Sequence, residues 1–242
     1  TGQSAGVALE QRRRRGRIAG RVKWRGPACR RGELFGRQCA PVPVRWNNAM
    51  LLLIAGLAIF FGVHSLRIFA EDWRGAQIAR LGVGAYKGVY SLLSLLGLAL
   101  ITIGYAQARA APVTLWDPPL WTRHLSALLV LFAFVLLVAA YVPRSRIRAA
   151  VGHPMTIGVK IWAAGHLLAN GTLADLLLFG SFLLWAVFDL RAARARDRRH
   201  GRVGVRASLL ADVATIVVGV VLWAAFALYL HGWLFGVRPF VA

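Results

Sequence analysis

Six apolar segments, separated by short polar stretches, constrain this chain more than any other feature of its sequence. Each segment is close to the roughly 20 residues that an α-helix needs to cross the hydrocarbon core of a bilayer. Backbone N–H and C=O groups in lipid must pair inside their own segment, so we expect helices throughout. The sequence therefore predicts an all-α, polytopic integral membrane protein with six transmembrane helices, near residues 50–69, 88–107, 121–142, 154–170, 172–190 and 208–230.

Composition and charge agree with a membrane protein. Of the 242 residues, 58% are hydrophobic and 16% are charged, and the formal net charge is +21. In a soluble protein this excess of positive charge would suggest nucleic-acid binding. Here the basic residues gather in short loops between the apolar segments and in one N-terminal block. We therefore expect a lipid bilayer as the surroundings of the chain and no nucleic-acid partner.

The N-terminal block, residues 1–49, differs from the rest of the chain. It has 12 basic and 2 acidic residues and lacks the apolar core of a signal peptide. The first methionine is Met50, directly before the first apolar segment. Our interpretation is that residues 1–49 are upstream sequence translated from a mis-assigned start; the alternative is a disordered basic arm that binds lipid or nucleic acid. Both cysteines, Cys29 and Cys39, lie in this block, which excludes thiolate metal sites and disulfides from the predicted transmembrane domain, residues 50–235.

Arginines in the loops predict the orientation in the membrane. They cluster after the third and the fifth apolar segments, so we expect both loops on the cytoplasmic side. The fourth and fifth segments then form a hairpin that turns on the outer side at Asn170-Gly171, a strong turn dipeptide. The same alternation places residues 71–87 on the cytoplasmic side, as a short interfacial amphipathic helix or an ordinary loop. Both ends of the six-helix unit then lie outside.

The fourth segment, within GHPMTIGVKIWAAGHLLANG, carries three ionisable side chains in an apolar context: His153, Lys160 and His166. Such side chains at membrane depth usually face a protein interior, a cavity or a ligand, so the segment is a site candidate. His153 and Lys160 are seven residues apart and share one helix face. We expect Lys160 to snorkel toward the interface or to pair with Asp189, Asp212 or an anionic ligand group such as a haem propionate.

The predicted topology sorts the histidines by depth. His64, near the cytoplasmic end of the first segment, and His153, at the start of the fourth, lie at similar depth on different helices. Two axial ligands of one haem require this, because each neutral imidazole offers one nitrogen to the iron from opposite faces. The alternative is that these histidines cap helices or meet lipid headgroups. His124 and His166 are candidates for a second, outer pair. His153 and His166 are about 20 Å apart along one helix and cannot share an iron.

Arg67 and four glycines are further residues for which the sequence predicts a role. Arg67, close to His64, is either a positive-inside anchor or a charge partner for an acidic ligand, so Arg67 and Lys160 are the candidate cofactor-binding side chains. No catalytic motif with a nucleophile and a base is found. Close helix packing is expected at four glycines, Gly56, Gly62, Gly97 and Gly104.

Three stretches resemble the NnrU family of bacterial membrane proteins: GVHSLRIF, GHPMTIGVKIWAAGHLLANG and DLLLFGSFLLWAVFDLRAARARDRR. The resemblance extends from Met50 to the sixth apolar segment. It implies a multi-pass protein of the bacterial inner membrane that is associated with denitrification. The implied partners are nitrite and nitric oxide reductase systems, whose expression or activity the family supports.

The same motifs are similar to those of 15-cis-zeta-carotene isomerase, an integral membrane enzyme that uses haem b with histidine ligation. This similarity implies haem b as cofactor, His64 and His153 as its ligands, and His166 as the reserve for the second position. A cysteine of the isomerase, an alternative ligand, has no counterpart here. Three functions stay open: a haem-binding protein of nitrogen-oxide metabolism, a haem-dependent cis–trans isomerase of a polyene, and a non-catalytic membrane assembly or sensing partner.

Overall fold

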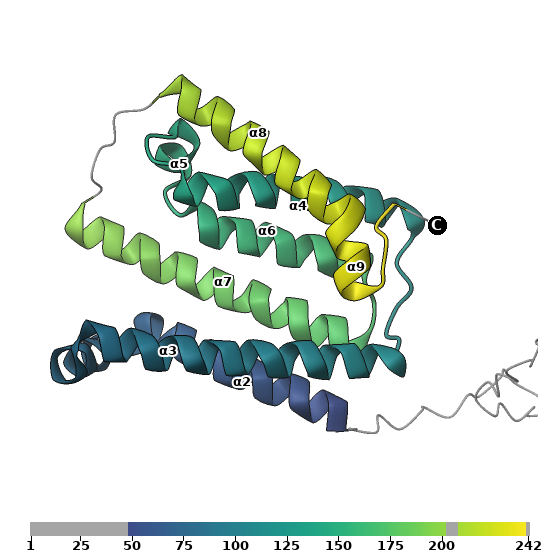
Figure 1. The fold of residues 1–242 in the computed structure, drawn as a ribbon, viewed down its shortest axis with the longest axis horizontal. Helices are drawn as coiled ribbons and strands as arrows, with labels where there is room; N and C mark the ends of the chain where they lie inside the picture. Colours follow the sequence, from purple (N-terminus) through teal and green to yellow (C-terminus); the bar gives the residue numbers. More distant parts are fainter. Residues whose placement is uncertain (1–47, 202–207, 241–242) are drawn as a thin grey trace, which may run out of the picture. The chain divides into compact units, whose positions relative to one another are not determined.

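The computed structural model describes residues 48–201 and 208–240, all within one compact unit, Trp46–Ala242. The interpretation of residues 1–49 therefore falls almost entirely outside the described residues. The described part contains no β-strand, only two isolated bridges, which confirms the all-α prediction. The elements are α2 (Asn48–Phe69), α3 (Glu71–Ala110), α4 (Leu120–Tyr141), α5 (Arg146–Val151), α6 (Pro154–Ala169), α7 (Leu173–His200), α8 (Leu209–Ala225), η1 (Phe226–Leu230) and α9 (His231–Phe235) (Figure 1).

Five helical stretches are long and apolar enough to cross a membrane: α2, α3, α4, α7, and α8 continued through η1 and α9. The chain is therefore a polytopic membrane protein, but the sixth predicted crossing is not confirmed. That crossing corresponds to α6, which has 16 residues. At 1.5 Å per residue α6 is about 24 Å long, shorter than the roughly 30 Å hydrocarbon core of a bilayer.

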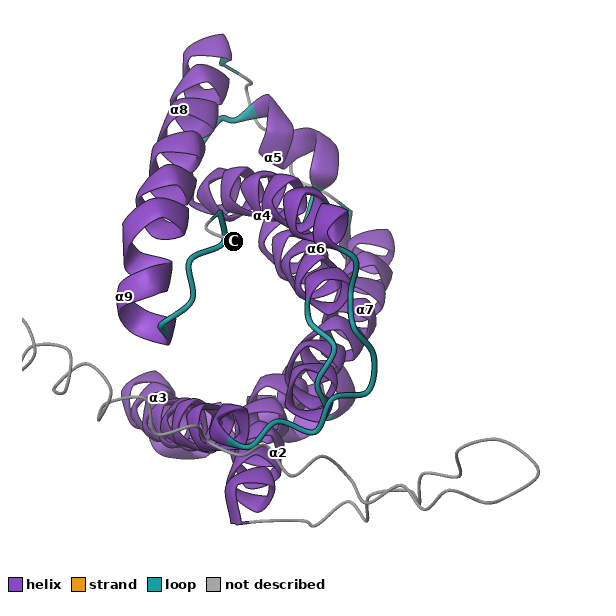
Figure 2. Ribbon diagram, turned by 90° about the vertical axis from the view of Figure 1, so that its right-hand side faces the viewer, coloured by secondary structure: helices purple, strands orange, loops and turns teal. Residues whose placement is uncertain are grey.

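The long helices pack side by side in the order α3, α2, α7, α6, α4, α8 (Figure 2). Loops alternate between two ends, as predicted. At one end, which we call the basic end, Arg196 of α7 donates to the carbonyl oxygen of Arg67 in α2, and the Ser208 amide donates to the Arg144 carbonyl. At the opposite end the Leu173 amide donates to the carbonyl before α4, that of Val113. The assignment of the basic end to the cytoplasm stays a prediction.

Helices α2 and α3 approach each other closely through glycines. A Cβ atom at Gly56 would lie 2.6 Å from the backbone nitrogen of Ile101, and one at Gly97 would lie 2.9 Å from the backbone of α2. Gly104 likewise has α2 backbone directly beside its Cα. The predicted packing role is therefore confirmed at these three glycines. It is wrong for Gly62, which is exposed and where an added Cβ would have no neighbouring atom within 4 Å.

The predicted loop 71–87 is helical and forms the first part of α3. At Gly82 the backbone leaves the helical region, with φ 79° and ψ 158°, and the chain changes direction. The segment before Gly82 runs across the direction of the rest of α3 (Figure 1). Of the two predicted alternatives, the structure therefore favours the helix over the ordinary loop. Its position at a membrane interface stays a prediction.

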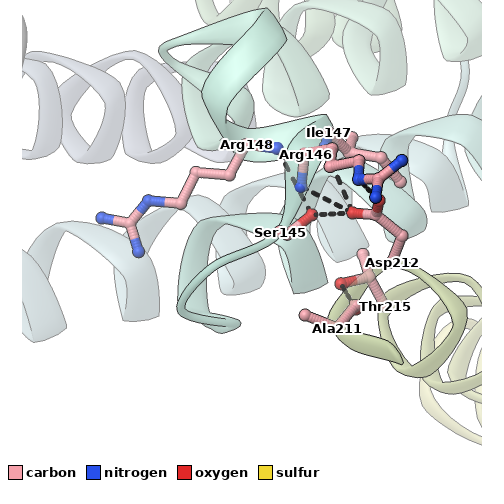
Figure 3. A network of polar contacts seen from close by, with 7 residues as sticks. All are labelled: Ser145, Arg146, Ile147, Arg148, Ala211, Asp212 and Thr215. Atoms are coloured by element: carbon pink, nitrogen blue, oxygen red, sulfur yellow. Dashed lines mark hydrogen bonds and ion pairs between the residues drawn. The ribbon is translucent and has the colours of Figure 1, made fainter. Parts of the chain in front are cut away.

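A carboxylate fixes α8 to the short helix α5 at the basic end (Figure 3). Asp212, in the first turn of α8, accepts hydrogen bonds from the Ser145 hydroxyl at 2.9 Å and from the Arg146 amide at 2.6 Å. Its second oxygen lies 3.8 Å from Nε of Arg146. Asp212 was one of the partners predicted for Lys160, and the structure instead commits it to α5.

Candidate functional site

His64 lies on α2 in a fixed orientation. Its Nδ1 donates to the carbonyl oxygen of Phe60, one turn earlier, at 2.7 Å, and its ring stacks on the Phe60 ring with centroids 4.0 Å apart. Tyr90 of α3 and Trp185 of α7 complete the surroundings, with ring centroids at 5.2 and 6.0 Å. Because Nδ1 must carry the hydrogen to donate, Nε2 of the neutral ring is the nitrogen that keeps its lone pair.

His166 repeats this arrangement on α6. Its Nδ1 donates to the carbonyl oxygen of Trp162, again one turn earlier, at 2.9 Å. The imidazole stacks on Phe179 of α7 with centroids 4.6 Å apart and lies 5.0 Å from the Trp162 ring. The two histidines therefore share one local frame, an aromatic residue four positions before the histidine, although the sequence predicted different roles for them.

An aromatic cluster on α2, α6 and α7 connects the two frames. Phe182 is its centre: its ring centroid is 5.7 Å from that of Phe60 and 5.4 Å from that of Trp162. Trp185, one turn further along α7, has a buried Nε1 with no hydrogen-bond acceptor among the described residues. A buried donor without an acceptor costs about 1–3 kcal/mol, so this N–H is a place where a ligand acceptor would be favourable.

His153 has a different partner. Its Nε2 lies 2.9 Å from Oδ2 of Asp197 on α7. Asp197 is twelve residues from Trp185, the α7 neighbour of His64, which corresponds to about 18 Å along the helix. The structure therefore places His64 and His153 in different surroundings and does not bring the two rings together. The pair stays a prediction that the observed contacts do not support.

The sequence did not reveal Asp197 as the partner of His153. One signal was present, because Asp197 is the single acidic residue in the arginine-rich run RAARARDRRH. An acidic side chain in such a run is a candidate for a specific partner rather than for solvent. The sequence predicted a depth for His153 but gave no prediction for the direction in which its ring points.

A cavity of about 440 Å³ lies at the basic end, where α2, α6 and α7 meet. Its lining includes Arg67, His153 and Asp189 among the predicted residues. Lys160 is half-buried, and no hydrogen bond or ion pair joins it to another described residue. Its predicted partner Asp189 instead accepts from the Thr156 hydroxyl at 2.7 Å. The predicted roles of Arg67 and Lys160 in binding a cofactor stay predictions.

The outer pair predicted from His124 and His166 is not seen. His124 is exposed near the start of α4, whereas His166 is held by Trp162 and Phe179. The polar feature of this end is instead Asp175, buried at the start of α7, which accepts from the Tyr105 hydroxyl at 2.5 Å. The T-x-x-D capping box that begins with Thr172 was readable in the sequence, but its partner Tyr105 on α3 was not.

The donor chemistry of the two frames can be compared with that of a haem site. In such sites the ligating imidazole commonly donates its other N–H to a carbonyl, which fixes the ring and the coordinating nitrogen. His64 and His166 meet this requirement through Nδ1, and their surroundings are aromatic. His153 differs in the nitrogen that is engaged: its Nε2 pairs with a carboxylate, so Nδ1 is the nitrogen that remains for a metal.

Comparison with known proteins places the chain in a family. The family model described as "NnrU protein" matches residues 52–239, which include every described helix except the first turn of α2. No curated protein and no solved structure matches the chain. The match covers most of the chain and agrees with the motifs that led to the same resemblance, and the chain therefore belongs to the NnrU family.

Proposed function

We propose that this NnrU-family protein binds haem b and supports nitrogen-oxide metabolism from the bacterial inner membrane. The observation that carries the proposal is the frame of His64. The ring is fixed by its Nδ1 hydrogen bond and by stacking on Phe60, and its Nε2 is the nitrogen that remains for an iron. Family membership supports the link to nitrogen-oxide metabolism.

The Trp185 indole supports a ligand near His64. Its Nε1 is buried and lacks an acceptor among the described residues, while its ring lies 6.0 Å from the His64 ring. A bound group with an acceptor oxygen would satisfy this donor. Haem would supply an iron that binds small nitrogen oxides, and the chain would supply the fixed imidazole and the apolar, aromatic surroundings that exclude water.

The second axial position has two candidates that differ in what must move. His166 already donates its Nδ1 to a backbone carbonyl and contacts the same aromatic cluster as His64. His153 would have to leave Asp197 to present Nε2 to an iron, or coordinate through Nδ1, and it contacts none of the rings of the aromatic cluster among the described residues. We therefore rank His166, predicted as the reserve, above His153.

The absorption spectrum of the full chain tests haem binding. The protein would be expressed with a haem supply, purified in a mild detergent, and its haem content measured as haemochrome per chain. We expect a Soret band at about one haem per chain that His64→Ala abolishes. His124→Ala, which changes an exposed histidine on α4, is the matched control and should leave the band unchanged.

Two further variants separate the candidates for the second ligand. His166→Ala should shift or abolish the Soret band, while His153→Ala should preserve it. The reverse result would restore the pair predicted from depth. A wild-type protein without stoichiometric haem would refute the proposal and the isomerase alternative together.

Cellular assays separate the remaining functions. A deletion strain complemented with the wild type should recover nitrite or nitric oxide turnover, and His64→Ala should not complement. Conversion of a supplied 15-cis polyene in a carotenoid-producing host would instead favour the isomerase. Complementation by His64→Ala would favour a non-catalytic assembly or sensing partner without a cofactor.

A further inference from the structure

The cavity at the basic end is lined by charged residues to which the haem proposal gives no role. Its volume of about 440 Å³ is within the usual range of small-molecule sites, about 300–1,000 Å³. Charged side chains reach it from two helices, with Arg67 on α2 and Asp189 and Arg196 on α7. Met155 and Ala193 also line the cavity, so its lining contains both charged and apolar side chains.

Both arginines line the cavity, and Arg196 also contacts the backbone of Arg67. Arg196 Nη1 donates to the backbone carbonyl of Arg67 at 3.4 Å, which holds its guanidinium at the end of α2. Within residues 48–201 and 208–240, no ion pair within 4.0 Å involves either guanidinium. Two guanidiniums from neighbouring helices are suited to one phosphate or carboxylate, which accepts their N–H groups.

Asp189 is the opposite charge in the same cavity. One of its oxygens accepts from the Thr156 hydroxyl at 2.7 Å, and no cation pairs with it in the described part of the chain. The other carboxylate of the cavity, Asp197, is already engaged with His153. A half-buried carboxylate that pairs with no cation among the described residues is suited to a positively charged ligand group, so Asp189 favours a ligand with an ammonium.

These charges define the class of ligand. A simple anion would satisfy the arginines and leave Asp189 unpaired, and a simple cation would do the reverse. A zwitterion with a phosphate and a primary ammonium satisfies both. The cavity lies at the ends of helices that span the membrane, the level at which phospholipid headgroups lie, and its apolar lining suits the glycerol and the start of the acyl chains.

We propose that this cavity binds the headgroup of a phosphatidylethanolamine molecule, with the phosphate between Arg67 and Arg196 and the ammonium at Asp189. A choline headgroup has no N–H to donate to the carboxylate, and a glycerol headgroup carries no positive charge. The proposal assigns Arg67 to a phosphate rather than to a haem propionate. It stands independently of haem binding.

Lipid retention by the purified full chain tests the proposal. The protein in a neutral detergent would be incubated with equal amounts of phosphatidylethanolamine, phosphatidylcholine and phosphatidylglycerol of the same acyl chains. Bound lipid would then be counted by native mass spectrometry. We expect about one phosphatidylethanolamine per chain, at least about tenfold over either other lipid. Equal retention of the three lipids would overturn the proposal.

Substitutions of the charged residues test which of them binds the phosphate and which binds the ammonium. Asp189→Asn should lower retention of phosphatidylethanolamine to the level of phosphatidylcholine, and Asp189→Glu, which keeps the charge, should restore the preference. Arg196→Gln should lower retention of phosphatidylethanolamine. Arg191→Gln, at an exposed position of α7 outside the cavity, is the matched control and should retain it. An undiminished preference in a helical, monodisperse Asp189→Asn protein would overturn the assignment.

A soluble competitor separates a lipid from a free metabolite. Glycerophosphoethanolamine carries the same charges without acyl chains. We expect it to displace phosphatidylethanolamine only in large excess, because the apolar lining contributes to lipid binding. Displacement at equal concentration would overturn the identification of the ligand as a lipid.

Discussion

The contact between α2 and α3 gives a sharp test of the structure, because it depends on the absence of a single methyl group. A Cβ at Gly56 would lie 2.6 Å from the Ile101 nitrogen and 2.9 Å from both the Gly97 oxygen and the Leu100 Cβ. Two of these three atoms belong to the backbone and cannot rotate away. In Gly56→Ala the two helices must therefore separate, by about 0.8 Å if ordinary contact at 3.4 Å is to be restored.

The cost follows from what the separation loosens. Leu53, Leu57 and Ile101 are almost fully buried beside Gly56, and a gap of 0.5–1 Å removes about a quarter to a half of a dispersion contact. Overpacking of this kind typically costs about 1–3 kcal/mol. Alanine regains up to about 1 kcal/mol of helix propensity. We expect a net loss of about 1–2 kcal/mol in the free energy of unfolding.

Gly62→Ala is the matched control, since it is the same change on the same helix at an exposed position with nothing within 4 Å. It should be neutral or slightly stabilising. Unfolding in mixed micelles of increasing dodecyl sulfate content, followed by tryptophan fluorescence and circular dichroism, measures both variants. A midpoint for Gly56→Ala at or above that of Gly62→Ala would refute the close packing of α2 on α3.

Two polar contacts give further predictions. Tyr105→Phe removes the hydroxyl that donates to Asp175 at 2.5 Å. It should lower the free energy of unfolding by about 1–3 kcal/mol in the same assay. Tyr141→Phe, at an exposed tyrosine, should have no effect. Asp212→Asn weakens the acceptor of the first amides of α5, those of Arg146 and Ile147. Hydrogen exchange at these amides should therefore become faster, by up to about tenfold. In the control Asp72→Asn, exchange at the same amides should match the wild type.

The helices themselves were predictable because hydropathy and length determine them in a membrane. The segment expected at 50–69 is observed as Asn48–Phe69, and that expected at 121–142 as Leu120–Tyr141. The segment expected at 88–107 is part of the longer α3, because the preceding residues continue as helix and only Gly82 interrupts it. Charge in the loops also predicted which loops share an end of the bundle.

The partners of the polar side chains were not predictable to the same degree. A topology gives the depth of a histidine but not the rotation of its helix, and the rotation decides which neighbour the ring meets. The aromatic neighbourhood of His64 and the contact of His153 with Asp197 were therefore not predicted. Partners that lie far apart in the sequence, such as Tyr105 and Asp175, are brought together only by packing.

The short helix α6 carries polar residues and packs between α4 and α7. Its α4 side is built from glycines seven residues apart: a Cβ at Gly158 would lie 3.1 Å from the Ala133 carbonyl, and one at Gly165 would lie 3.3 Å from Leu129 Cβ. This close approach shields one face of α6 from lipid without using a polar side chain. The opposite face meets α7, where Thr156 and His153 pair with carboxylates and His166 stacks on an aromatic ring.

The two packed faces of α6 therefore give its polar side chains partners within the protein. A helix enclosed by α4 and α7 meets protein over much of its surface, so its polar side chains are solvated by protein rather than by hydrocarbon. Two different sites lie along α6. The charged cavity is at its basic end, and His166 with its aromatic neighbours is toward the other end. If Asp189→Asn changes lipid retention but not haem content, and His166→Ala does the reverse, the cavity and the His166 frame act as independent sites. Loss of both properties in either variant would mean that the two sites are coupled.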